Sequence, residues 1–182
     1  MTSIPRLSFS HMGIFVADLA RMEDFYTRVL GFAVTDRGEL GATTIVFLSL
    51  DPREHHQIIL ATGRTASQPD SAGFNPINQI SFRLSELAAL RQMAQRLKNE
   101  GVQDLAPVSH GNALSVYFRD PEGNRLELFV DTPWYVRQPL RIPMDLSLPD
   151  AALWAWAEAE ARRQPDFQSV EEWRAQIARR IK

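Results

Sequence analysis

The chain has 182 residues, of which 45% are hydrophobic, and a chain of this kind can bury the core of one domain without disulfides. Twenty lysine and arginine residues face 22 aspartate and glutamate residues, so the net charge is −2. No basic run is longer than a pair, which argues against a nucleic-acid partner. Because cysteine is absent, the chain has no disulfides, thiolate metal sites or cysteine nucleophiles, and histidine, carboxylate and amide oxygen remain as metal ligands.

Hydropathy predicts a protein without a membrane partner. No apolar run approaches the roughly 20 residues that a membrane span requires. The absence of cysteine fits a reducing compartment, so we expect a cytoplasmic protein.

The chain repeats itself once. Gly31 and Gly101 lie 70 residues apart, and the Asp-Pro pairs that begin at Asp51 and Asp120 lie 69 apart. In the first module, apolar periodicity and turn residues predict a strand over 9–16, a helix over 19–30 and strands over 32–35, 43–50 and 57–61. The second module repeats this order, with a strand over 77–84, a helix opened by Ser85, and strands over 102–107, 114–119 and 125–130. Each module is therefore predicted to be βαβββ.

The segment after residue 131 has no counterpart in either module and carries all four tryptophans. An alanine-rich stretch over 151–163 predicts a helix, and Ser169 with Glu172 forms a capping box that predicts a second one. Trp173 and Ile177 share a face of that second helix. We expect the aromatic residues to pack this tail against the domain or against another subunit, and we expect a homodimer.

Strand parity brings three polar side chains to one surface. Neighbouring residues of a strand point to opposite faces, and alternate apolar residues mark the face that meets a helix. These apolar sets are Met12, Ile14 and Val16 in the first strand, Ile80, Phe82 and Leu84 in its repeat, and Leu126, Leu128 and Val130 in the last strand. His11, Gln79 and Glu127 point to the opposite side. An offset of 69 residues matches Glu127 with Ile58, and it places His56, two residues earlier, on the same face.

An imidazole, an amide oxygen and a carboxylate are ligands for a divalent first-row metal, and three protein ligands leave positions open for substrate. The set is close to the two-histidine, one-carboxylate triad of non-haem iron oxygenases, with Gln79 in place of the second histidine. Because an amide oxygen is a weaker, neutral donor, we expect lower iron affinity than a full triad gives, and tolerance of Mn, Zn or Ni.

Four segments resemble the vicinal oxygen chelate superfamily, which includes glyoxalases, bleomycin- and fosfomycin-resistance proteins and extradiol dioxygenases. They are VYFRDPEGNRLELF over 116–129, VSHG over 108–111, HMGIFV over 11–16 and EHHQIIL over 54–60. The resemblance covers about residues 7–135 and is strongest to the branch related to biphenyl-2,3-diol 1,2-dioxygenase.

This resemblance implies an α+β fold in which paired βαβββ modules form an incomplete curved β-barrel with the helices outside. The module boundaries are about 7–63 and 75–131, within a domain over 1–135, and a helical C-terminal extension covers 136–182. It also implies that His11, Gln79 and Glu127 are the metal ligands, with Fe(II) as the expected metal. The positions that match catalytic residues of the family are His56, His110 and Tyr117.

The expected function is extradiol-type ring cleavage of a small catecholic diol with O₂, as in the catabolism of aromatic compounds. Two alternatives stay open. The first is a glyoxalase-type lyase or isomerase with a redox-inert divalent metal, which Gln79 favours and the lack of a carboxylate at Ile58 disfavours. The second is a metal-free protein that binds an aromatic ligand, as in the bleomycin-resistance branch.

Each candidate residue also has a purely structural interpretation. A histidine in a strand, such as His11, is often a hydrogen-bonded structural residue, and Gln79 could satisfy a backbone group. His56 could be a surface residue, His110 could only shape a turn, and Tyr117 could be core. His55 is expected to face solvent. The segment 120–124 is expected to be a turn and nothing more.

Overall fold

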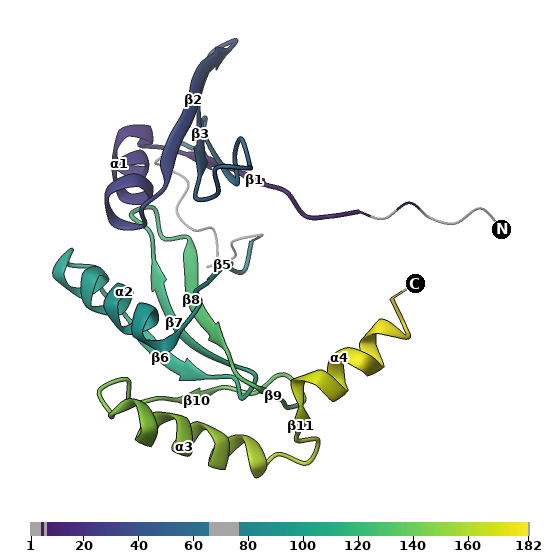
Figure 1. Ribbon diagram of the computed structural model, residues 1–182. Helices are drawn as coiled ribbons and strands as arrows, with labels where there is room; N and C mark the ends of the chain where they lie inside the picture. Colours follow the sequence, from purple (N-terminus) through teal and green to yellow (C-terminus); the bar gives the residue numbers. More distant parts are fainter. Residues whose placement is uncertain (1–4, 6, 66–76, 182) are drawn as a thin grey trace. The chain divides into compact units, whose positions relative to one another are not determined.

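The computed structural model describes residues 5, 7–65 and 77–181, and the chain divides into two compact units. Unit 1 holds the residues before 77 together with Asp120–Gly123, and unit 2 holds Ile77–Arg119 and the chain from Asn124 onward. The fold is α+β, with mixed sheets that remain open, as the sequence predicts (Figure 1).

Unit 1 has the predicted βαβββ order. It contains β1 (Met12–Val16), α1 (Leu19–Asp24), a π-helical turn η1 (Phe25–Val29), β2 (Ala33–Leu40), β3 (Thr43–Ser49) and β4 (Ile58–Thr62). The sheet order is β1-β4-β3-β2, with β1 parallel to β4 and the other pairs antiparallel. The first strand is shorter than predicted, since it begins at Met12, and β2 is longer, since it runs to Leu40.

The predicted helix over 19–30 changes character halfway. From Phe25 it becomes a π-helical turn, in which the Leu30 N–H donates to the Phe25 carbonyl at 3.1 Å. The Thr27 hydroxyl donates to the Glu23 carbonyl at 2.8 Å, and side-chain hydrogen bonds of this kind compete with the regular helical pattern. Apolar spacing does not reveal this change, because Phe25, Tyr26 and Val29 stay buried through it.

Unit 2 begins with the same order. It contains β5 (Ile80–Arg83), α2 (Leu87–Asn99), β6 (Ala106–Ser109), β7 (Ala113–Arg119) and β8 (Arg125–Asp131). The sheet order is β10-β6-β7-β8-β5, with β5 parallel to β8. Ser85 does not cap the helix as predicted, because the N-cap is Glu86. The strand predicted over 102–107 begins only at Ala106, after Asp104 adopts a φ of 58°.

The predicted apolar faces are buried. Ile14 and Val16 of β1 lie inside unit 1, and Leu126, Leu128 and Val130 of β8 lie inside unit 2. Helix α2 buries Leu87, Leu90 and Leu97 and packs on β7 and β8. Each fully buried leucine contributes about 1.5 to 3 kcal/mol, so this layer fixes which side of the sheet stays polar.

The C-terminal tail is built into unit 2. Its elements are β9 (Trp134–Tyr135), β10 (Ile142–Pro143), α3 (Asp150–Arg162), β11 (Gln168–Ser169) and α4 (Val170–Ala178). Strand β10 extends the sheet next to β6, and β11 pairs with β9 (Figure 1). The Trp134 and Trp154 rings meet edge to face at 6.2 Å, and the predicted capping box forms. The predicted packing of the tail aromatics against the domain is confirmed.

The segment 120–124 is more than a turn, which corrects the prediction. One oxygen of the Glu122 carboxylate accepts hydrogen bonds from the backbone N–H groups of Ala17 and Asp18, at 2.7 and 2.8 Å. Its other oxygen lies 3.3 Å from Arg64. Glu122 therefore ties the second Asp-Pro turn to the start of α1, within unit 1.

Replacing Glu122 with alanine is expected to lower the free energy of unfolding by about 2 to 3 kcal/mol, because two charge-assisted backbone hydrogen bonds are lost. Urea unfolding followed by circular dichroism measures the change. Glu54→Ala, in the corresponding exposed turn of unit 1, is the control and is expected to stay within about 0.5 kcal/mol of the parent. Equal effects of the two substitutions would contradict the assignment.

The remaining expectations concern boundaries and membranes. Residues 75 and 76 of the predicted second module lie outside the described residues, and the boundary at 135/136 stays a prediction. In the described part of the chain, no helix has the length and apolar character needed to span a membrane.

Candidate functional site

A row of polar side chains crosses the sheet of unit 2. Ser81 of β5 and Tyr117 of β7 are both register partners of Glu127 in β8, so the three side chains share one face. Gln79 lies two residues before Ser81 and joins the same side. This is the face opposite α2, as strand parity predicts.

Glu127 is the centre of this row. Its side chain is buried, with 6% of the residue exposed. One carboxylate oxygen accepts hydrogen bonds from the Gln79 amide at 2.8 Å and from the Ser81 hydroxyl at 2.5 Å. Within the described residues, no lysine or arginine forms an ion pair with it. Glu127 is therefore a buried carboxylate held by neutral donors, an arrangement that a cation would stabilise.

His110 follows β6 and reaches the same face from its loop. Its Nδ1 lies 2.6 Å from the Leu140 carbonyl, and a carbonyl only accepts, so Nδ1 carries the proton. Nε2 of the neutral ring then accepts from the Tyr117 hydroxyl at 2.9 Å and lies 3.7 Å from Glu127. The histidine thus presents an unprotonated nitrogen beside the carboxylate.

Tyr117 is held from both sides. Burial raises the pKa of its hydroxyl to about 12, and the nearby Glu127 carboxylate adds to the rise. The Arg125 guanidinium lies 4.3 Å from the ring centre, at cation–π distance. Tyr117 therefore stays a neutral hydrogen-bond donor at physiological pH.

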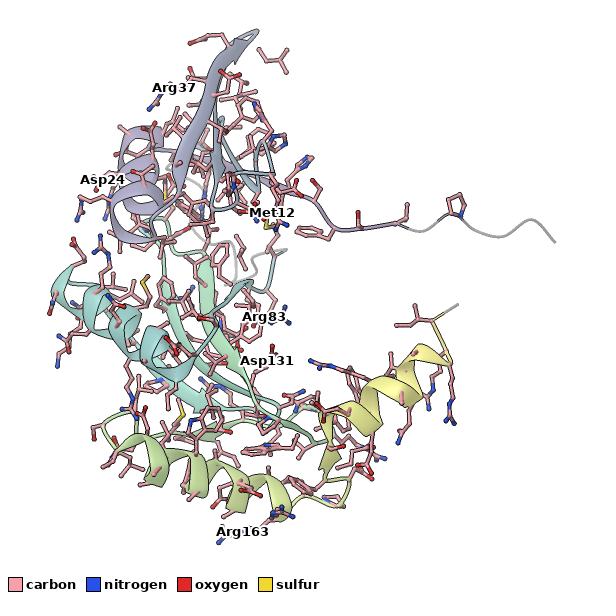
Figure 2. The ribbon with its side chains drawn as sticks, viewed as in Figure 1. Met12, Asp24, Arg37, Arg83, Asp131 and Arg163 are labelled. Atoms are coloured by element: carbon pink, nitrogen blue, oxygen red, sulfur yellow. The ribbon has the colours of Figure 1, made fainter. Side chains whose placement is uncertain are left out.

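The polar face ends in an ion pair. Arg83 and Asp131 lie next to each other on β5 and β8, 2.9 Å apart (Figure 2). The Arg83 guanidinium also lies 5.1 Å from the centre of the Phe129 ring. Because Asp131 takes up the charge of Arg83, this arginine leaves Glu127 without a cationic neighbour.

Unit 1 holds a separate group of three histidines. The rings of His11 and His56 meet at 4.2 Å, and both rings of the neighbouring pair, His55 and His56, contact Phe47. Nδ1 of His55 lies 2.8 Å from Nδ1 of His56. Burial lowers the pKa of His56, and repulsion by His11 and His55 lowers it further.

The pairing register corrects the match between the modules. Met12 pairs with Ile58 in β1 and β4, as Ile80 pairs with Leu126 in β5 and β8. Glu127 therefore corresponds to Ile59 and not to Ile58 as the sequence offset predicts. His11 keeps its predicted match with Gln79. His56 reaches the face of His11 through the loop before β4, and not through strand parity with Ile58.

The structure brings together four of the six predicted site residues, all in unit 2: Gln79, Glu127, His110 and Tyr117. His11 and His56 contact each other in unit 1. The described residues contain no group of three His, Cys, Asp or Glu side chains arranged to hold a metal, and the predicted set includes only two residues of these types. The three-ligand metal site stays a prediction.

Sequence reasoning missed three contributors to the site. The role of Ser81 could have been inferred, since it shares the parity of Gln79. Arg125 lies two residues before Glu127 and could have been placed on this face in the same way. The Leu140 carbonyl carried no signal, because it belongs to the tail and approaches His110 only in the folded chain.

Three comparisons with known proteins agree with this geometry. A sequence model of the Glyoxalase/Bleomycin resistance protein/Dioxygenase superfamily matches residues 8–128. The chain belongs to this superfamily. The resemblance seen in the sequence is therefore confirmed.

Two curated relatives in the superfamily are biphenyl-2,3-diol 1,2-dioxygenases 2 and 3 of Rhodococcus globerulus, 30% and 31% identical to this chain over 131 and 135 residues. Each alignment covers 72% of this chain but only 65% and 66% of the relative. The fosfomycin resistance protein FosX of Listeria monocytogenes, solved with Mn(II) and sulfate, has a similar fold, with a TM-score of 0.53 and 20% identity. That match covers 71% of this chain and 95% of FosX.

Proposed function

We propose that this protein is a metal-dependent extradiol-type dioxygenase that cleaves the ring of a small catecholic diol. The observation that carries the proposal is the buried Glu127 carboxylate, which has neutral donors on one oxygen and the His110–Tyr117 pair beside the other. The two dioxygenase relatives support it. They are longer than the stretch that aligns, so activity and substrate are proposals for this chain.

The donor set fits a divalent metal. Glu127 offers a buried carboxylate without a cationic partner among the described residues, and the Gln79 side chain beside it offers an amide oxygen. His11, which corresponds in register to Gln79, is the third proposed ligand. When bound, Fe(II) supplies a Lewis acid for the diol oxygens and the one-electron chemistry that O₂ requires. Mn(II), which the structure of FosX contains, is a second candidate, and Zn or Ni a third.

The residues around the carboxylate have distinct proposed roles. The unprotonated Nε2 of His110 can take a proton from a diol hydroxyl and later return it. The Leu140 carbonyl holds the ring so that this nitrogen faces the site. Tyr117 donates a hydrogen bond through its neutral hydroxyl. His56, next to His11 and with a lowered pKa, is proposed as a further neutral histidine at the substrate.

Oxygen uptake tests the proposed reaction. Protein purified without oxygen and loaded with Fe(II) is expected to consume one O₂ per diol and to give a yellow ring-opened product from catechol or 2,3-dihydroxybiphenyl. A lack of oxygen uptake by iron-loaded, folded protein across a panel of diols contradicts the proposal. Tight binding of a redox-inert metal without oxygen uptake would favour the lyase or isomerase alternative, which Gln79 supports. Diol binding by metal-free protein that takes up no metal would favour the binding-protein alternative.

Gln79→His is expected to tighten Fe(II) binding by about tenfold, or about 1.4 kcal/mol, because imidazole is a stronger donor to iron than an amide oxygen. Anaerobic competition with a coloured chelator measures this affinity without relying on turnover. Asn78→His, at the exposed neighbouring position on the opposite strand face, is the matched control and is expected to change nothing. Unchanged or weaker iron binding by Gln79→His would show that residue 79 is not a ligand.

A further inference from the structure

The C-terminal tail contains a pocket of about 330 Å³, within the size range of small-molecule sites. It lies in unit 2 where α4 packs on β9 and β11, outside the segment that matches the superfamily (Figure 1). Its lining residues are Tyr135, Arg137, Asp166, Gln168, Trp173, Gln176, Ile177 and Arg180. None of these residues has a role in the function proposed above.

One wall of the pocket is flat and aromatic. The rings of Tyr135 and Trp173 stack with their centres 5.0 Å apart and their planes 12° apart. In β9, Trp134 points into the core and Tyr135 to the opposite side. The Ser169 cap starts α4 so that Trp173 and Ile177, four residues apart, both line the pocket. Both stacked rings are only half-buried, so aromatic surface remains for a planar ligand.

The charges of the pocket do not balance. Arg137 pairs with Asp166 at 2.8 Å. Arg180 also lines the pocket, but in the described part of the chain its guanidinium forms no ion pair. Gln176 donates to Gln168 at 2.8 Å, so these neutral side chains satisfy each other. One unpaired guanidinium thus stands beside the aromatic wall, and a guanidinium binds a carboxylate through paired hydrogen bonds.

We propose that this pocket binds a small planar aromatic carboxylate. The ring of the ligand lies against the Tyr135–Trp173 wall, and its carboxylate pairs with Arg180. A single unpaired cation suits a singly charged acid better than a polyphosphate, and it leaves a neutral aromatic ligand without a partner for the guanidinium.

Binding of 2-naphthoate to the full chain, measured by calorimetry and by the fluorescence of Trp173, tests this proposal. The acid is expected to bind at least tenfold more tightly than its neutral isostere 2-naphthamide. Arg180→Gln is expected to remove this preference. Arg179→Gln, which removes the same charge from an adjacent exposed residue outside the pocket, is the control and is expected to retain it.

Three outcomes would overturn the proposal. One is a lack of naphthoate binding at millimolar concentration, and another is equal loss of binding in the two arginine variants. The third is binding that His110→Ala abolishes and Arg180→Gln leaves intact, which would place the ligand on the strand face of unit 2. Both arginines are exposed, so unchanged thermal midpoints are expected and verify that the variants fold.

Discussion

Glu127→Gln is expected to lower the rate of diol cleavage by at least about 100-fold, since even outer partners of a metal site cost about 10- to 100-fold when removed. The amide has the shape of the carboxylate but not its charge, and the charge is what a buried cation requires. The bound metal, measured by elemental analysis after anaerobic loading, is expected to fall together with the rate.

The apo protein gives a second measurement for Glu127→Gln. Gln79 and Ser81 are neutral donors, and an amide oxygen at position 127 still accepts from them. Metal-free variant and parent are therefore expected to unfold within about 1 kcal/mol of each other, because an isosteric change that keeps the hydrogen bonds is mild. Glu86→Gln, an exposed change at the start of α2, is the control for both measurements. Full metal content with lost activity would exclude Glu127 as a ligand.

The order of elements and the polar face were predictable for local reasons. Alternation along β5 and β8 depends only on neighbouring residues, so parity correctly brought Gln79 and Glu127 together. The same argument applied to Ser81, whose hydroxyl it did not use. Burial of the alternate leucines in β8 then left only one side on which Glu127 could lie.

The features that sequence reasoning got wrong depend on loop lengths and distant contacts. The modules match with an offset of 70 residues at the glycines after the helices, but the strand register requires 68 at β4 and β8. A single offset of 69 therefore placed Ile58, and not Ile59, opposite Glu127. Glu122 was interpreted as a turn residue because its partners, the N–H groups of Ala17 and Asp18, lie more than 100 residues away.

The tail contributes more to the site than its lack of repeat symmetry suggests. The Leu140 carbonyl fixes the tautomer of His110, and the Gln138 amide donates to the His110 carbonyl at 2.6 Å. Both residues follow the segment that matches the superfamily. The proposed proton acceptor is thus oriented by residues outside the duplicated modules, which connects the packing of the tail to catalysis.

This connection can be tested at Gly111, next to His110. Gly111 has a φ of 76°, and an added Cβ would lie 2.2 Å from Cγ2 of Val136. Gly111→Ala is expected to lower the free energy of unfolding by about 3 kcal/mol, of which about 1 to 2 kcal/mol comes from the left-handed backbone and the rest from the clash. Urea unfolding measures it. Because relief of the clash displaces the tail segment that carries Leu140, the rate of diol cleavage is expected to fall as well.

Gly41→Ala separates the two causes. Gly41 has a φ of 63°, but an added Cβ there has no atom within 4 Å, so only the backbone cost of about 1 to 2 kcal/mol applies. It lies in the turn between β2 and β3 of unit 1, and this variant is expected to keep full activity. If Gly111→Ala proves no more destabilising than Gly41→Ala, Val136 does not pack on the loop of His110. If it destabilises the fold but leaves the activity of the remaining folded protein unchanged, the tail stabilises the fold without orienting the histidine.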